Sequence, residues 1–233
     1  MMLEERRRKS RRRLVAATAL LMVAATTWWI SRPPAPKPFA FQDAACGESY
    51  HRLYARENIL VRVVFGYKDA RPARFVGDRY ERAAFVGALE RPCEPGRADC
   101  GFRRSASDAD LLEKEILGPE GKKHLVKVEV ISSAAGPDDQ ENGKDPFQAW
   151  KTEQARQAFL AGFREADALF YYGHSRGGGG PDFGPPKLDP ESRVDFAWYR
   201  AHKSGRKELA EAIAGSPALP KLMGLYSCVS GEL

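Results

Sequence analysis

Short apolar runs alternate with amphipathic stretches over most of this chain. Runs that are rich in β-branched and aromatic residues predict four strands: ILVRVVFGY (59–67), HLVKVEVIS (124–132), DALFYYG (167–173) and PKLMGLYSC (220–228). Apolar residues at helical spacing predict helices over residues 78–90, 108–117, 147–166 and 205–215. The third of these helices has Phe147, Trp150, Ala155, Phe159 and Phe163 roughly along one side.

This order of elements predicts the fold class. Strands that alternate with helices connect by right-handed crossovers, which build a mainly parallel sheet with helices on both faces. We therefore expect a three-layer α/β domain over residues 46–233. In such a sheet, ligands bind beyond the carboxyl ends of the strands. Two of the predicted strands end in residues with useful chemistry: one in Gly173-His174-Ser175, the other in Ser227-Cys228.

The N-terminal part has a different pattern. Residues 14–30 hold no charge in 17 positions and end in a tryptophan pair, which is typical of a transmembrane or signal-anchor helix. A basic leader, residues 1–13, precedes it, and a proline-rich spacer, residues 31–45, follows. Positive charge before the apolar run predicts a bacterial-type inner-membrane protein with one span and its domain on the periplasmic, extracytoplasmic side.

The charge distribution argues against a nucleic-acid partner. The net charge is +6, but the leader contains six arginines and one lysine against two glutamates. The leader therefore carries +5, and the other 220 residues carry only +1. The folded part is nearly neutral, so it has no basic surface of the kind that binds a phosphate backbone.

Four cysteines, Cys46, Cys93, Cys100 and Cys228, fit an oxidising compartment, where thiols tend to pair. CEPGRADC places Cys93 and Cys100 at the two ends of a Pro/Gly turn, which predicts a local disulfide. Four cysteines allow three pairings, which leaves a Cys46–Cys228 disulfide open as well. The spacing is a poor zinc pattern, and no metal or organic cofactor is predicted.

The GHSRG segment around Ser175 allows a serine hydrolase. It has the form of a G-x-S-x-G nucleophile elbow, which requires a sharp turn directly into a helix and a downstream histidine. Glycines and prolines crowd residues 177–190 and disfavour such a helix, and His202 is the single later histidine.

A cysteine mechanism needs only the two strand ends. His174 and Cys228 are 54 residues apart, and neighbouring parallel strands would bring a base close to a nucleophile. ADALFYYGHSRGG followed by LPKLMGLYSC resembles the two signature strands of caspase-like cysteine peptidases, the group of caspases, gingipains and clostripain. The resemblance implies His174 as general acid/base and Cys228 as nucleophile, acting on a protein or peptide substrate. It also implies the backbone amides of Ser175 and Cys228 as oxyanion donors, with the glycine run as a mobile loop beside the cleft.

The sequence departs from this family in two ways. The family usually has His-Gly where this chain has His174-Ser175. The sequence also stops five residues after Cys228, whereas the resemblance implies further strands. An incomplete, catalytically inactive domain that acts as an interaction module is therefore the non-enzymatic alternative.

Overall fold

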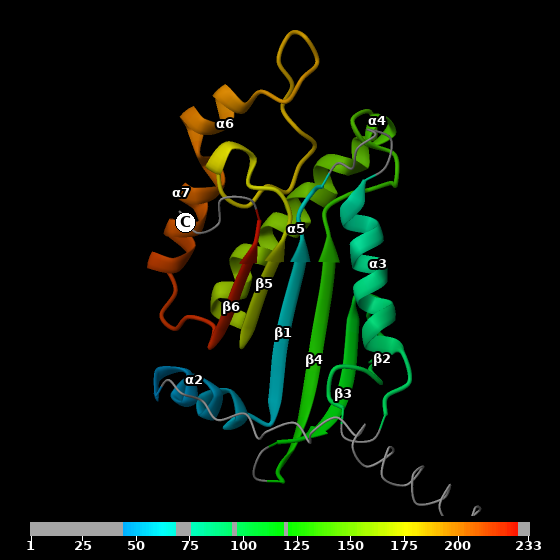
Figure 1. Cartoon of the computed structure of the whole chain (residues 1–233), viewed down its shortest axis with the longest axis vertical. Helices are drawn as coiled ribbons and strands as arrows, with labels where there is room; N and C mark the ends of the chain where they lie inside the picture. Colours follow the sequence, from blue (N-terminus) through cyan, green and yellow to red (C-terminus); the bar gives the residue numbers. More distant parts are fainter. Residues whose placement is uncertain (1–43, 69–75, 95–96, 119–120, 228–233) are drawn as a thin grey trace, which may run out of the picture. The chain divides into compact units, whose positions relative to one another are not determined.

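The computed structural model describes residues 44–68, 76–94, 97–118 and 121–227, apart from the side chains of residues 44–46. The chain divides into two units, residues 1–42 and 43–233, and all described residues belong to the second (Figure 1). The leader, the predicted membrane segment and most of the spacer lie outside the described residues. Within the described part, no helix is both long and apolar enough to span a bilayer.

A six-stranded sheet forms the centre of the second unit. The strands are β1 (Asn58–Phe65), β2 (Arg103–Arg104), β3 (Leu111–Leu117), β4 (Lys123–Ser132), β5 (Ala168–Tyr172) and β6 (Leu222–Tyr226). Their order is β2-β3-β4-β1-β5-β6, in which β4, β1, β5 and β6 are parallel and β2 and β3 are antiparallel (Figure 1). The predicted mainly parallel sheet is confirmed.

Helices cover both faces of the sheet, as predicted. They are α2 (Ala44–Tyr54), α3 (Gly77–Glu90), α4 (Asp139–Asn142), α5 (Pro146–Glu165), α6 (Phe196–His202) and α7 (Ser204–Ala214), with a 3-10 turn, η1 (Arg176–Gly178). Helix α3 packs on β1 and β4. Helix α5 packs on the opposite face of the sheet, and α7 packs against α5. The three-layer α/β architecture follows from this arrangement.

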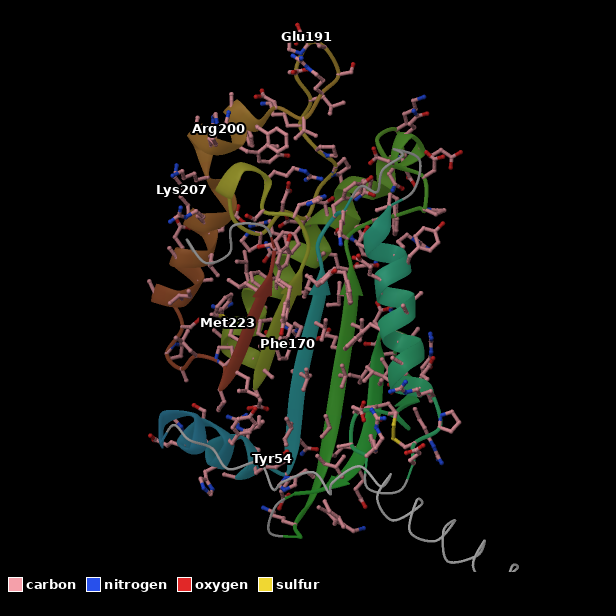
Figure 2. The ribbon with its side chains drawn as sticks, in the orientation of Figure 1. Tyr54, Phe170, Glu191, Arg200, Lys207 and Met223 are labelled. Atoms are coloured by element: carbon pink, nitrogen blue, oxygen red, sulfur yellow. A yellow bond between two sulfur atoms is a disulfide. The ribbon has the colours of Figure 1, made fainter. Side chains whose placement is uncertain are left out.

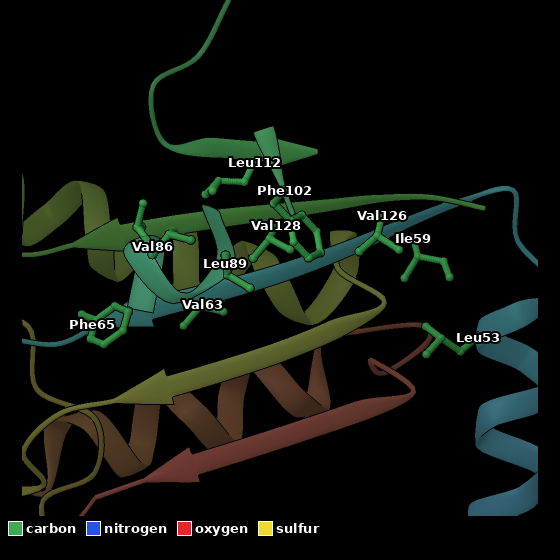
Figure 3. Close-up of a cluster of buried hydrophobic side chains, with 11 residues drawn as sticks. Leu53, Ile59, Val63, Phe65, Val86, Leu89, Phe102, Leu112, Val126 and Val128 are labelled. Atoms are coloured by element: carbon green, nitrogen blue, oxygen red, sulfur yellow. The ribbon is translucent and has the colours of Figure 1, made fainter. Parts of the chain in front are cut away.

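Strand β1 explains why the sheet has two cores. Successive side chains of a strand point to opposite faces. Val63 and Phe65 therefore lie in the cluster under α3, which Figure 3 shows, whereas Val64 lies in the cluster under α5. Arg62 also faces α5, where its buried guanidinium donates to Glu129 and Glu165. These two carboxylates compensate the cost of burying that charge.

Residues 111–117 form a strand, so the helix predicted over residues 108–117 is wrong. The segment pairs antiparallel with β4, placing the buried Leu112 opposite Val128. Lys127 and Lys123 of β4 pair with Glu113 and Glu115 at 3.4 and 2.7 Å. Cross-strand pairing thus overrides the helix propensity of a Leu- and Glu-rich segment, because propensity is weaker than tertiary contact.

The predicted third helix exists as α5, but its predicted face is partly wrong. Ala155, Phe159 and Phe163 are buried, whereas Phe147 and Trp150 are 53% and 52% exposed and stack on each other at 4.6 Å. The apolar side chains at the start of α5 are therefore outside the core. Gln148 is the buried residue there, and it donates to the Ser133 carbonyl at 2.8 Å.

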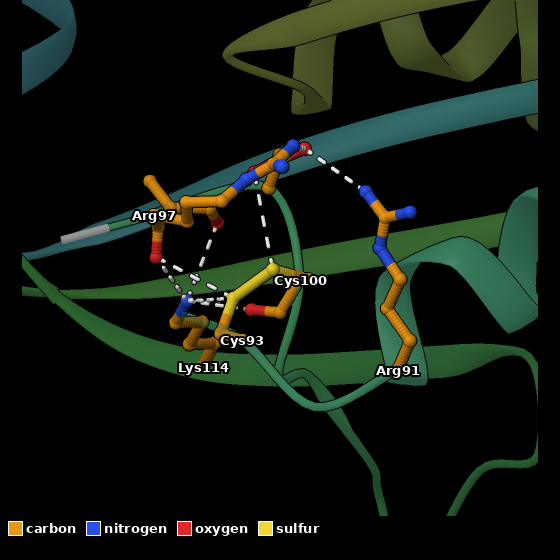
Figure 4. Close-up of a disulfide and its surroundings, with 7 residues drawn as sticks. Arg91, Cys93, Arg97, Cys100 and Lys114 are labelled. Atoms are coloured by element: carbon orange, nitrogen blue, oxygen red, sulfur yellow. Dashed lines mark hydrogen bonds and ion pairs between the residues drawn. A yellow bond between two sulfur atoms is a disulfide. The ribbon is translucent and has the colours of Figure 1, made fainter. Parts of the chain in front are cut away.

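The predicted disulfide between Cys93 and Cys100 is confirmed (Figure 4). It closes the turn that follows α3. Lys114 of β3 donates to the carbonyl oxygens of Cys100 and Arg97 at 2.6 and 3.1 Å, which joins this turn to the sheet.

Candidate functional site

The two predicted site segments follow neighbouring parallel strands. β5 pairs with β6 from Ala168↔Leu222 to Tyr172↔Tyr226, a constant offset of 54 residues. This offset equals the separation of His174 and Cys228. Phe170 and Met223 mark the two strands side by side in Figure 2. Cys228 lies outside the described residues, and so does the open question of a Cys46–Cys228 disulfide.

His174 is half-buried just past the end of β5. The amide of the preceding Gly173 donates to the Tyr226 carbonyl at 3.1 Å, which extends the pairing with β6 by one step. The hydroxyl of Tyr171 donates to the His174 carbonyl at 2.8 Å. The backbone on both sides of the imidazole is thus tied to the sheet.

The glycine loop, residues 173–184, is packed. The buried Arg176 pairs across it with Asp182, whose side chain is 19% exposed, and Arg176 Nη1 also lies 3.2 Å from the Gly184 carbonyl oxygen. These bonds connect the two halves of the loop to each other, and its expected mobility stays a prediction.

Helices α6 and α7 hold the outer side of the glycine loop. The amide of Arg206 donates to the Gly179 carbonyl at 2.8 Å, and the backbones at Gly180 and Gly205 approach too closely for a Cβ on either residue. Gly180 also has φ of +91°, which favours glycine. Figure 2 labels Arg200 on α6 and Lys207 on α7.

The surroundings of Ser175 do not fit a nucleophile elbow. Ser175 is 1% exposed, and one 3-10 turn follows it in place of an α-helix. The next described α-helix begins at Phe196. His202 is exposed near the end of α6, with its ring stacked on Trp198 at 4.3 Å. The α-helix that an elbow requires directly after the serine is therefore missing after Ser175.

A charged cluster that sequence reasoning missed lies where β1 and β5 end. Lys68 Nζ lies 2.6 Å from Glu81 Oε1, 3.4 Å from the Tyr172 hydroxyl, and over the Tyr172 ring. Burial lowers the pKa of Lys68, but its hydrogen bonds to Glu81 and Tyr172 outweigh burial, so the pKa rises overall. The amide of Gly77 bonds to the Lys68 carbonyl, which brings the start of α3 to this edge.

A buried polar cluster lies at the same edge, between β1, β4 and α4. Tyr67, Asp78 and Asn142 are almost fully buried, and the Asn142 amide donates to the Tyr67 hydroxyl at 3.2 Å. Burial raises the pKa of Asp78 to about 7, against backbone donors such as Ala134 that lower it. No group of three or more His, Cys, Asp or Glu side chains in the described ranges is arranged to hold a metal ion.

Unsatisfied polar atoms gather at this carboxyl edge of the sheet. In the described part of the chain, four buried side-chain atoms have no hydrogen-bond partner: Asp78 Oδ1, Glu81 Oε2, Ser133 Oγ and Ser227 Oγ. Ser133 directly follows β4, Ser227 directly follows β6, and the two acids lie in the first turns of α3. Buried polar atoms without a partner are rare in folded proteins, and a functional role is one explanation for them.

A surface groove lies away from this edge. It runs between α5 and α7 and is lined by residues such as Arg156, Leu160, Glu208 and Glu211. It belongs to the helical layer and contains none of the predicted site residues. The concentration of polar chemistry therefore favours the carboxyl edge as the site.

Comparisons with known proteins found no match. No protein-family model, no curated protein and no solved structure matches this chain. Nothing in them identifies a caspase-like domain.

Proposed function

We propose that this α/β domain is a cysteine-dependent hydrolase of the caspase-like type that cleaves peptide bonds. The observation that carries the proposal is the register of β5 and β6. Tyr172 is paired with Tyr226, and His174 and Cys228 each follow one member of this pair by two residues in the sequence. Neighbouring strands are about 4.8 Å apart, a spacing that suits an imidazole and a thiol in contact.

The chemistry assigns each group a role. The Cys228 thiolate attacks the substrate carbonyl carbon and forms a thioester as the peptide C–N bond breaks, and His174 protonates the leaving amine. Water then hydrolyses the thioester and frees Cys228. The backbone amides of Ser175 and Cys228 would hold the oxyanion. The packed glycine loop supports this role, because an oxyanion donor works best when it is fixed in advance.

The compartment is part of the proposal. The Cys93–Cys100 disulfide supports an oxidising environment, in agreement with a domain outside the cytoplasmic membrane. The uncharged segment 14–30 would provide the membrane anchor.

The test is the reactivity of Cys228 in the full chain, solubilised in detergent. Iodoacetamide labelling is followed by mass spectrometry of the tryptic peptide that begins at Leu222, over a pH series. A poised thiolate should react well below pH ~8.5, the pKa of a free thiol. The His174→Ala variant should react at least about tenfold more slowly near pH 6, the effect of one pKa unit on the thiolate fraction.

Two controls make this result specific. His202→Ala removes an exposed histidine and should leave the Cys228 rate unchanged. Ser175→Ala should retain peptide hydrolysis, whereas Cys228→Ala should abolish it. A Cys228 that reacts only after reduction or unfolding would refute the mechanism.

A further inference from the structure

Tyr171 is the most constrained polar residue at the end of β5. Its ring is fully buried, packed against Phe159 and Phe183 with ring centroids 5.6 and 5.4 Å away. Its hydroxyl lies 2.8 Å from the His174 carbonyl oxygen and 2.8 Å from both the amide nitrogen and the carbonyl oxygen of Asp182. One side-chain oxygen thus contacts both halves of the glycine loop.

The space around this hydroxyl is equally specific. A Cβ at Gly66 or at Gly173 would collide with it, so both strand exits leave room for the hydroxyl by being glycine. Burial raises the pKa of Tyr171 far above that of a free phenol, which keeps the proton available for donation. The hydroxyl accepts the Asp182 N–H and shares its single proton between the two carbonyl oxygens.

We infer that Tyr171 is a positioning residue, whose hydroxyl joins the backbone of His174 to that of Asp182 and thereby fixes the proposed site. The inference rests on the proposed function. The Arg176–Asp182 ion pair continues the same connection, because the side chain of Asp182 holds Arg176 while its backbone holds Tyr171. The carbonyl of His174 belongs to the peptide group that supplies the Ser175 N–H, so one bond orients both the imidazole and the proposed oxyanion donor.

Packing alone does not perform this role. Phenylalanine at position 171 would keep the ring contacts with Phe159 and Phe183 but would leave the two carbonyls and the Asp182 amide without this partner. The expected consequence is a loosened loop on an intact sheet. A loosened loop on an intact sheet would distinguish a positioning role of Tyr171 from a merely structural one.

The test compares Tyr171→Phe with Tyr67→Phe in the full chain in detergent. Tyr67 is a matched control because it is also a buried tyrosine, with its hydroxyl bonded to Asp139 and Asn142. Hydrogen exchange of residues 174–183, read by mass spectrometry, should accelerate about tenfold in Tyr171→Phe, the effect of one lost buried hydrogen bond. Cys228 alkylation near pH 6 should slow about tenfold in the same variant, and Tyr67→Phe should change neither measurement.

The outcomes separate the two proposals. If both tyrosine variants change loop exchange and Cys228 alkylation equally, the positioning role is overturned while the hydrolase proposal stands on His174→Ala. If His174→Ala leaves Cys228 unchanged, the hydrolase proposal fails, and the exchange of residues 174–183 still decides the role of Tyr171.

A measurement on the wild-type protein covers the case in which Tyr171→Phe does not fold. The Asp182 amide should be as protected from exchange as the amides of β5, because its partner is fully buried. Exchange as fast as that of the exposed residues 189–192 would overturn the inference.

Discussion

The two ends of β5 are built from different interactions. At the amino end, the buried Asp167 carboxylate accepts from the Leu60 amide at 3.0 Å and pairs with Arg56 and Lys221, each at 3.2 Å. At the carboxyl end, the neutral Tyr171 hydroxyl holds a glycine loop by backbone bonds.

The two ends also differ in how completely their buried polar side-chain atoms are hydrogen-bonded. Both oxygens of Asp167 are bonded, whereas all four unsatisfied buried side-chain atoms of the described residues lie at the carboxyl edge. The buried carboxylate at the amino edge is fully paired, which indicates a structural role. The carboxyl edge holds buried polar atoms that lack a hydrogen-bond partner among the described residues, as expected of a binding or catalytic edge.

The largest expected effect is at the amino end. Asp167→Ala leaves Lys221 and the Leu60 amide without their partner, so the free energy of unfolding should fall by about 3 kcal/mol, below the upper range for a broken buried pair because Arg56 is half exposed. Urea denaturation measures this change. Asp99→Ala, which removes an exposed pair, should cost less than about 1 kcal/mol. Equal losses in the two variants would contradict this structural role of Asp167.

The carboxyl edge should instead respond to pH. The folded-state pKa of Asp78, about 7, is above its ordinary value of 3.8, so between these values the folded protein binds more protons than the unfolded chain. Stability contributed by the protonated form is therefore lost as the pH rises through 7. We expect a fall of about 2–3 kcal/mol between pH 5 and pH 8.

The Asp78→Asn variant should remove most of this fall, because an amide does not ionise. Urea midpoints at several pH values test it. Asp145→Asn is the matched control, since Asp145 is an exposed helix cap that asparagine can replace. A wild-type curve that rises from pH 5 to pH 8 would contradict the buried, protonated Asp78.

The smallest effect concerns the Cys93–Cys100 disulfide, which follows the far end of α3. Replacing both cysteines by serine should lower the free energy of unfolding by about 2 kcal/mol, as expected for a short closed loop. Labelling of Cys228 should keep its pH profile, because the bonds of this turn in the described residues join it to Lys114 of β3. A changed profile would show that the disulfide and the carboxyl edge are coupled.

Local pattern was sufficient for much of the fold. The four predicted strands correspond to β1, β4, β5 and β6, and three of the four predicted helices are α3, α5 and α7. The helix predicted over residues 108–117 failed because Leu112 and its neighbours satisfy a helical and a strand pattern equally well, and only the presence of β4 decides between them.

The candidate site was predictable to a lesser degree. The sequence identified His174 by its place at a strand end. Only the register of β5 and β6 shows that the 54-residue spacing of His174 and Cys228 equals the offset between the two strands. The Lys68–Glu81 pair and the buried Asp78 have no local signal, since each depends on the approach of α3 to the exits of β1 and β4.

The sequence by itself determined the alternation of strands and helices, the pairing of Cys93 with Cys100 and the two strands that precede His174 and Cys228 in the chain. These features depend on the periodicity and spacing of neighbouring residues. Only the tertiary structure decided that β3 is a strand, that the glycine loop is packed, and that Tyr171 holds it. These features depend on contacts between segments that only the fold brings together. The Tyr171 hydroxyl, for example, gains its partner at Asp182 only because the glycine loop returns to the end of β5.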